Sequence, residues 1–106
     1  MSQPQNEPLS SAEWDEAYAS LQRRQDTRDA AEYALADHYE KVRRLLLNPD
    51  GSYREGARGE VERRLGIGRS SLRYIQRSDP ELMRRETAER RIREDAEVAR
   101  LRTGAS

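Results

Sequence analysis

Residues 58–77 read RGEVERRLGIGRSSLRYIQR and predict two short helices joined by a tight turn. Apolar residues recur at spacings of three and four, which places them on one face of each predicted helix. Gly66 suits the turn, because glycine tolerates the positive φ with which a chain often leaves a helix. Two such helices that cross steeply are expected to close one small core, made of Val61, Leu65, Ile67, Leu72 and Ile75.

The opposite face of the second predicted helix is cationic and rich in hydrogen-bond donors. Arginine binds guanine and phosphate with two parallel donors, and a helix that presents such groups suits the major groove of DNA. Two further arginines at the end of the first helix are placed to hold the phosphate backbone. The candidate DNA contacts are Arg69, Ser70, Arg73, Tyr74 and Arg77, together with Arg63 and Arg64.

The segment LGIGRSSLRYI, residues 65–75, resembles the turn and recognition helix of bacterial helix-turn-helix proteins of the LGISRSTLYRYL kind. That pattern occurs in resolvases, phage and plasmid regulators and small repressors. Gly68 stands where the family has a serine cap, and glycine is also accepted there. Glu62 stands where the family has alanine, so its carboxylate is expected to need a partner such as Arg69 or Arg73.

This resemblance implies a small sequence-specific DNA-binding protein. Its expected role is transcriptional regulation in a phage, plasmid or integrated element, with helix 69–77 inserted in the major groove. Because one such unit contacts few bases, the resemblance also implies a homodimer on two half-sites about one helical turn apart. The expected partners are double-stranded DNA and a second copy of the chain.

Composition allows one small domain and excludes several kinds of site. The chain has 106 residues, of which 34% are hydrophobic and 38% charged, with no Cys and one His. This excludes disulfides and a His/Cys zinc site, and neither an apolar run of membrane-spanning length nor a secretory signal is present. We expect a cytoplasmic protein.

The net charge of the chain is zero, but the charge is unevenly distributed. Residues 51–77 hold seven Arg against three Glu, so positive charge concentrates on the predicted motif.

The residues before the motif predict a tail and one or two helices. Residues 1–9 are polar and are expected to be disordered. Ser10 and Glu13 have capping-box spacing before an apolar face with Trp14, Ala17, Tyr18 and Leu21, which is expected to lie across the next helix as core.

Residues 28–47 predict that next helix, ended by Asn48-Pro49-Asp50-Gly51. Whether residues 25–28 form a turn or continue one helix is left open. The apolar stripe of helix 28–47 is Ala31, Ala34, Leu35, His38, Val42, Leu45 and Leu46.

The residues after the motif predict a charged helix that begins at Ser78-Asp79-Pro80-Glu81 and runs to about Arg102. We expect it to be a solvated helix that docks through Leu82 and Met83. A dimer-forming arm through Ile92, Ala96 and Ala99 is the alternative. Pairs of opposite charge four residues apart are expected to support it: Glu81–Arg85, Glu86–Arg90, Glu89–Arg93, Arg90–Glu94, Arg91–Asp95 and Arg93–Glu97.

The sequence thus predicts an all-α protein of four to five helices, with a central helix-turn-helix and a long charged C-terminal helix. Its parts are a tail at 1–9, a helical domain at 10–77 and a charged helix with a short tail at 78–106. No catalytic group, metal site, cofactor or small-molecule substrate is evident, so an enzyme is not expected. Two alternatives remain: a helical protein–protein adaptor, and the DNA-recognition subunit of a packaging or recombination machine.

Overall fold

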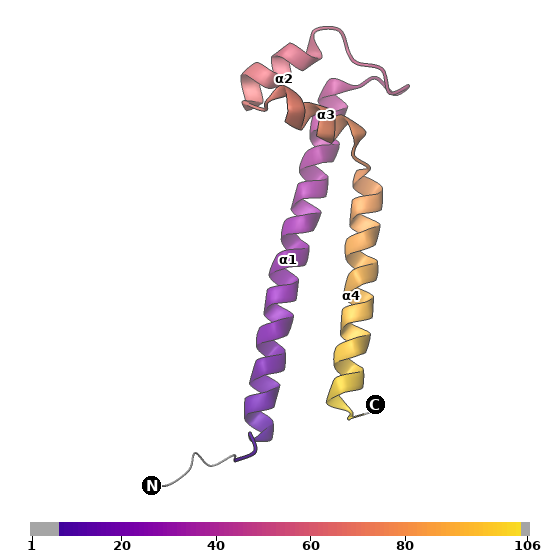
Figure 1. The fold of residues 1–106 in the computed structure, drawn as a ribbon. Helices are drawn as coiled ribbons and strands as arrows, with labels where there is room; N and C mark the ends of the chain where they lie inside the picture. Colours follow the sequence, from indigo (N-terminus) through magenta and orange to yellow (C-terminus); the bar gives the residue numbers. More distant parts are fainter. Residues whose placement is uncertain (1–6, 105–106) are drawn as a thin grey trace.

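The computed structural model describes residues 7–104 and is all-helical over that range (Figure 1). Residues 1–6 of the expected tail lie outside the described part. A long helix, α1 (Ser11–Leu46), runs antiparallel to α4 (Pro80–Arg102), and the two short helices α2 (Ala57–Leu65) and α3 (Arg69–Arg77) lie across one end of that pair. The result is an elongated molecule of 75 × 33 × 17 Å, with a head formed by α2 and α3 on a two-helix hairpin.

Helix α1 is a single helix of 36 residues, which resolves the question left open at residues 25–28. Its start is the predicted capping box: the Ser10 hydroxyl accepts from the Glu13 N–H at 3.2 Å, and the Glu13 carboxylate accepts from the Ser10 N–H at 2.8 Å. The expectation that Trp14 and Tyr18 lie across a separate long helix as core is therefore wrong. Trp14 is on α1 itself and is 52% exposed.

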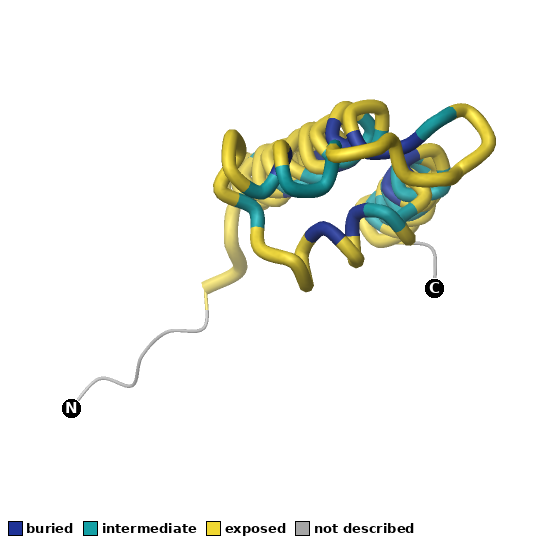
Figure 2. Tube along the Cα trace, turned by 90° about the horizontal axis from the view of Figure 1, so that it is seen from above, coloured by how far each residue is buried: buried dark blue, intermediate teal, exposed yellow. Residues whose placement is uncertain are grey.

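The hydrophobic core lies where the head meets the end of α1. Figure 2, seen from above, marks in dark blue the buried residues of the chain, which include residues of α1, α2 and α3. Leu65, which was expected in this core, is instead 48% exposed. Ile67 is half-buried and packs against the core. Of the apolar stripe predicted on helix 28–47, only Val42 and Leu46 are buried. The core consists of Val42, Leu46, Leu47, Val61, Leu72 and Ile75.

The turn between α2 and α3 has the predicted geometry. Gly66 ends α2 with φ of 65°, and its N–H donates to the carbonyl oxygen of Glu62 at 3.1 Å. Gly68 begins α3 with extended backbone. Glu62 pairs with Arg58 of its own helix at 4.0 Å, not with Arg69 or Arg73. Because Gly66 has left-handed backbone angles, α2 ends there and α3 runs in a different direction.

Helix α4 packs along α1 instead of projecting into solvent beyond its first turn (Figure 1). It begins as predicted, with the Asp79 carboxylate accepting from the Leu82 N–H at 3.0 Å and Pro80 in the first turn. The seam between the two helices is mostly polar, since its buried residues include Gln25, Asp29 and Thr87. Its heptad-like spacing of three and four runs through Tyr18, Gln22, Gln25, Asp29, Glu32 and Ala36 on α1 and through Arg84, Thr87, Arg91, Glu94 and Val98 on α4.

Ion pairs across this seam replace most of the pairs expected along α4. Asp29 is central, since it accepts from Arg90 at 3.0 Å and from Arg91 at 3.1 Å. Within α4, the predicted pairs Arg90–Glu94 and Arg91–Asp95 are present, at 3.9 and 2.9 Å. Acids lie mainly on α1 and arginines on α4 in the cross-helix pairs, which are Asp15–Arg102, Asp26–Arg91, Asp29–Arg90, Asp29–Arg91, Glu32–Arg90, Asp37–Arg84 and Glu40–Arg84, with Arg28–Glu94 reversed.

These contacts lower the pKa of four of the carboxylates, Asp29, Glu32, Glu40 and Glu94. A hydrogen bond from Arg90 lowers the pKa of Glu32, and one from Arg28 lowers that of Glu94. Burial raises the pKa of Asp29, but hydrogen bonds from Arg28, Arg91 and Arg90 outweigh it, so the net pKa is lowered. None of the helices in the described range is long and apolar enough to cross a membrane.

The turn predicts opposite effects for two glycine-to-alanine changes. Gly66→Ala should lower the free energy of unfolding by about 1–2 kcal/mol, because L residues are strained at positive φ. Gly59→Ala, inside α2, should raise it by roughly 0.5–1 kcal/mol, since a new methyl group would meet only the mobile end of Arg63. Urea unfolding of both variants measures this, and equal effects would contradict the geometry of the turn.

The polar seam predicts a loss of stability in acid. Carboxylates whose folded pKa is lowered stabilise the fold at pH values above their unfolded pKa of about 4, and this contribution is lost as pH falls through the folded pKa. Unfolding free energy should therefore fall between neutral pH and about pH 3. Asp29→Asn should lower stability at neutral pH and flatten this dependence. An unchanged pH profile in the variant would show that the seam does not depend on Asp29.

Candidate nucleic-acid interface

The candidate interface is the outer face of α3, and the core beneath it sets its orientation. Leu72 and Ile75 are buried against the end of α1, so residues on the other side of the nine-residue helix must point outward. Arg43 of α1 holds the end of α3 in place, because its Nη1 donates to the carbonyl oxygens of Gln76 and, at 3.4 Å, Ile75. Sequence reasoning did not identify this role of Arg43.

Four of the predicted residues lie together on this face. One hollow of about 620 Å³ is lined by Ser70, Arg73, Tyr74 and Arg77, together with Ser78, which caps the end of α3, and Met83 of α4. The chain reversal at Ser78-Asp79 brings α4 to this position. The hollow therefore combines two guanidinium groups with the hydroxyl groups of Ser70 and Tyr74, a set of donors that suits an anionic, oxygen-rich ligand. The Ser78 hydroxyl group already donates to the carbonyl oxygen of Ile75.

The arginines of α3 are not held by carboxylates of the chain. Within residues 7–104, Arg69, Arg73 and Arg77 are exposed and make no ion pair, although most other arginines of the hairpin do. Arg69 does not line the hollow and lies toward its flank. Because no internal carboxylate neutralises them, these three side chains give the head a positive potential that is available to a ligand.

Tyr74 has a different environment from the one that sequence suggested. It is 67% exposed, and its ring meets the ring of Tyr39 on α1 edge to face, with centroids 5.9 Å apart. This contact fixes the direction of the phenol group along the rim of the hollow. Tyr74 thereby joins α3 to α1 on the surface while its hydroxyl group stays accessible.

Arg63 and Arg64 stand apart from the hollow, on α2. Both pair with Glu60, at 3.0 and 2.8 Å, and both remain largely exposed. A hydrogen bond from Arg63 is the main cause of the lowered pKa of Glu60. These two arginines are accessible to a phosphate, but they would exchange a carboxylate partner for it.

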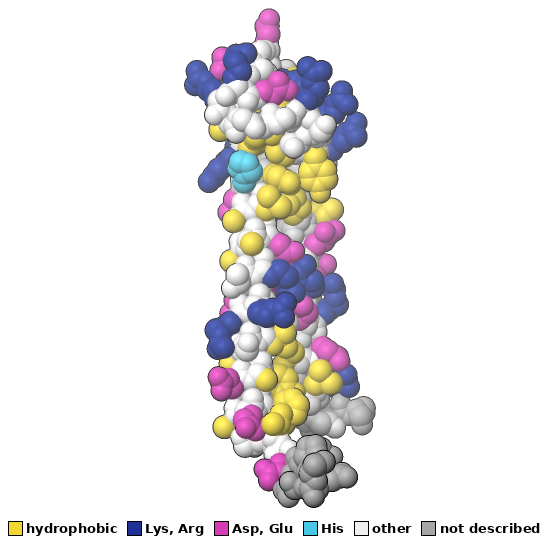
Figure 3. Space-filling view, turned by 60° about the vertical axis from the view of Figure 1, so that its left-hand side comes forward, with side chains coloured by type: hydrophobic (Ala, Val, Ile, Leu, Met, Phe, Trp, Pro, Cys, Tyr) yellow, Lys and Arg dark blue, Asp and Glu magenta, His cyan; other side chains and the backbone are white. Residues whose placement is uncertain are grey.

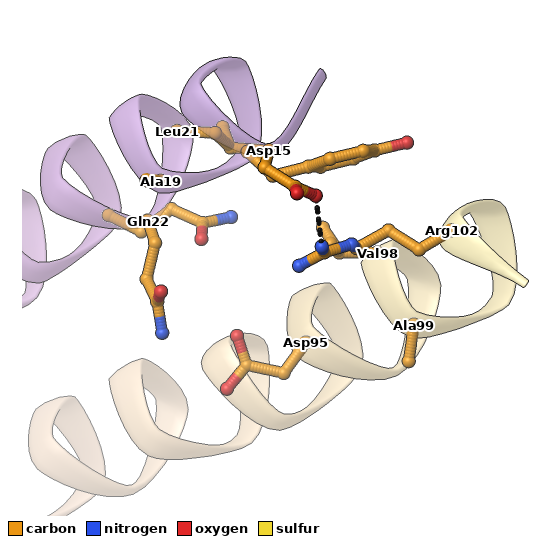
Figure 4. A pocket seen from close by; sticks show the side chains of 10 residues that line it. Asp15, Ala19, Leu21, Gln22, Asp95, Val98, Ala99 and Arg102 are labelled. Carbon is orange, nitrogen blue, oxygen red and sulfur yellow. Dashed lines mark hydrogen bonds and ion pairs between the residues drawn. The ribbon is translucent and has the colours of Figure 1, made fainter. Parts of the chain in front are cut away.

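A second hollow lies at the far end of the hairpin, between α1 and α4 (Figure 4). Its volume is about 390 Å³, and Gln22 of α1 and Asp95 of α4 point into it from opposite sides. Arg102 closes one side, since it pairs with Asp15 at 2.7 Å and lies 4.8 Å from the centre of the Tyr18 ring. Because the Arg102 guanidinium group is already paired with Asp15, this hollow offers a ligand less unpaired positive charge than the face of α3 does.

The described residues contain no group of three or more His, Cys, Asp or Glu side chains that could hold a metal ion. His38 is exposed beside Tyr39, with ring centroids 6.3 Å apart. Comparison with known proteins found no matching family model, curated protein or solved structure.

The interface predicts which arginines matter for stability. Arg43→Ala should lower the free energy of unfolding by about 1–2 kcal/mol, because it removes the donor to the Gln76 carbonyl group at the end of α3. Arg73→Ala should change it by less than about 0.5 kcal/mol, since its side chain is exposed and unpaired. Denaturant titration followed by circular dichroism measures both, and a large loss in Arg73→Ala would mean that Arg73 is structural.

Proposed function

We propose that this protein binds double-stranded DNA and that α3 reads base edges in the major groove. The observation that carries the proposal is the exposed, unpaired set of Arg69, Arg73 and Arg77 on a helix whose other face is fixed by the core. In helix-turn-helix domains a short first helix likewise supports a second helix, and the second helix enters the major groove. The likeness of residues 65–75 to that motif supports the same interpretation.

Each side chain of the interface has a distinct proposed role. Arg73 and Ser70 face the centre of the outer surface and contact base edges, where a bidentate arginine–guanine pair contributes about 1–3 kcal/mol of discrimination. Arg69 shares this role from the flank of the helix. Arg77 and Tyr74 contact phosphates at the rim of the hollow, and Arg63 and Arg64 contact the backbone from α2.

The biological role that fits these features is regulation of transcription by a small protein of a phage, plasmid or integrated element. This part of the proposal rests on the motif and on the small size of the chain. A DNA-recognition subunit of a packaging or recombination machine would use the same contacts. Both roles place the protein in the compartment that holds the DNA, so we propose a cytoplasmic location in a bacterial cell.

A helical protein–protein adaptor is the second candidate. Large apolar side chains remain exposed along the hairpin, Trp14 and Ile92 among them, and such side chains are typical of surfaces that bind other proteins. An adaptor would show no binding to DNA even at low salt. Gel-shift titration over a range of salt concentrations separates the two, since contacts with several phosphates make DNA affinity fall steeply as salt rises.

Arg73→Ala provides the test of sequence reading. DNA fragments that bind the protein are first selected from a random pool. Arg73→Ala should then weaken binding to the selected fragment by roughly tenfold or more, and weaken binding to random DNA much less. Arg23→Ala, an exposed arginine on the hairpin, is the matched control and should affect both DNAs little. Equal loss on both DNAs would make Arg73 a phosphate contact.

A further inference from the structure

A line of residues runs along α1 beside the side that α4 covers, and all of them except the half-buried Arg28 are exposed. Figure 3 shows this side of the molecule, with apolar side chains above and below a band of charged ones. The residues recur at alternating spacings of three and four, so that every seventh position is equivalent, which is the pattern by which one helix packs on another. This outer seam consists of Trp14, Ala17, Leu21, Arg24, Arg28, Ala31, Leu35 and His38.

The outer seam lies beside the seam that binds α4 and shares no position with it, although Arg28 also pairs with Glu94 of α4 and Leu21 also lines the hollow between α1 and α4. Its large apolar members are Trp14, Leu21 and Leu35, which are 52%, 38% and 43% exposed. They would contribute little to stability in a monomer, because burial of apolar area is what makes such residues stabilising. The seven-residue spacing indicates that a helix, not a small molecule, covers them.

We propose that the outer seam packs against the outer seam of a second copy of this chain, with the two α1 helices antiparallel and the two-fold axis level with Asp26, beside Thr27. In this arrangement large residues meet small ones: Leu35 lies opposite Ala17, and Leu21 lies opposite Ala31. Such alternation fills the space between helices without voids. Beside the seam, Ser20, Thr27 and Ala34 are small and exposed, so the helices can approach closely.

Charge complementarity selects this orientation. Helix α1 begins with Glu13, Asp15 and Glu16 and ends with Lys41, Arg43 and Arg44. An antiparallel pair places the acidic start of each helix beside the basic end of the other, whereas a parallel pair places like charges together. In the proposed register Glu13 faces Lys41 of the second copy, and symmetry makes this contact twice. Neither residue forms an ion pair within residues 7–104.

The two arginines at the centre of the seam are compatible with this contact. Arg24 of one copy lies near Arg28 of the other. The charge of Arg28 is already matched, because its guanidinium donates to Asp29 at 2.9 Å and to Glu94 at 2.8 Å. Arg24 is exposed and carries a long aliphatic stem, so its head can reach solvent while the stem covers apolar surface.

This interface does not depend on DNA binding, but it has a consequence for the proposed function. The core of each head begins near Val42, 15 residues from Thr27, so at 1.5 Å per residue the heads are roughly 45 Å or more apart. Half-sites separated by one helical turn, about 34 Å, would be too close. The arrangement therefore requires a wider spacing than the motif alone suggested.

Charge reversal tests the interface in the absence of DNA. The wild-type chain should sediment as a dimer, and Lys41→Glu should raise the dissociation constant about tenfold or more by creating two like-charge contacts. Glu13→Lys should do the same, and the double variant Glu13→Lys/Lys41→Glu should restore the dimer. Thermal unfolding of each variant shows whether it is folded. A monomeric wild type, or a double variant as weak as the single ones, would overturn the proposal.

Engineered cysteines test the orientation, since the chain has none of its own. Thr27→Cys should form a disulfide between copies on mild oxidation, because the two equivalent residues lie beside the axis and close to each other. Leu21→Cys should not, since equivalent residues meet there only in a parallel pair. Ala30→Cys, exposed on another side of α1, is the control. Cross-linking of Leu21→Cys in preference to Thr27→Cys would contradict the antiparallel arrangement.

Discussion

The packing of Leu72 and Ile75 against the end of α1 is the contact on which the arrangement of the head depends. Leu72 has no exposed surface, and Val42 and Leu46 of α1 are equally buried beside it. With these residues inward, the 3.6-residue period places Ser70, Arg73 and Arg77 outward. Gly66 makes this possible by ending α2 with positive φ, and Arg43 secures the other end of α3. The proposed DNA contact is thus a consequence of where a few apolar residues are buried.

The hairpin uses a different kind of interaction from the head. Along α1 and α4, carboxylates and guanidinium groups occupy positions that apolar residues fill in most helix pairs. Each exposed ion pair contributes little, but a connected network such as that around Asp29 specifies which faces meet and in what register. Most of the carboxylates of α1 pair with arginines of the hairpin itself, so they do not pair with the arginines of α3. The positive charge of α3 therefore remains uncompensated.

The local features of helix ends and turns could be predicted from the sequence, since each depends on neighbouring residues. The Ser10–Glu13 capping box, the positive φ of Gly66 and the start of α4 at Asp79-Pro80 are all confirmed. The hairpin could not be predicted in the same way. Its inner seam passes through Gln25, Asp29 and Thr87, and a search for apolar periodicity does not detect a seam of polar residues. The apolar stripe that such a search found on residues 28–47 is mostly exposed.

The candidate site was predicted in part. The outward direction of Arg73 and Arg77 followed from helical periodicity, but the hollow beside them depends on how the chain turns into α4, which brings in Ser78 and Met83. Likewise, the partner of Glu62 is Arg58 on the same helix, and neither Arg69 nor Arg73 of α3 pairs with it. Contacts between helices depend on crossing geometry, and spacing along one helix does not specify that.

The most direct measurement of the central claim is an NMR titration of the labelled full-length protein with a DNA fragment selected from a random pool. The account predicts that the largest changes in backbone and arginine side-chain signals occur at residues 69–77, with smaller ones at Arg63 and Arg64 and little change along the middle of the hairpin. Saturable changes confined to the hairpin, or no changes at low salt, would contradict it.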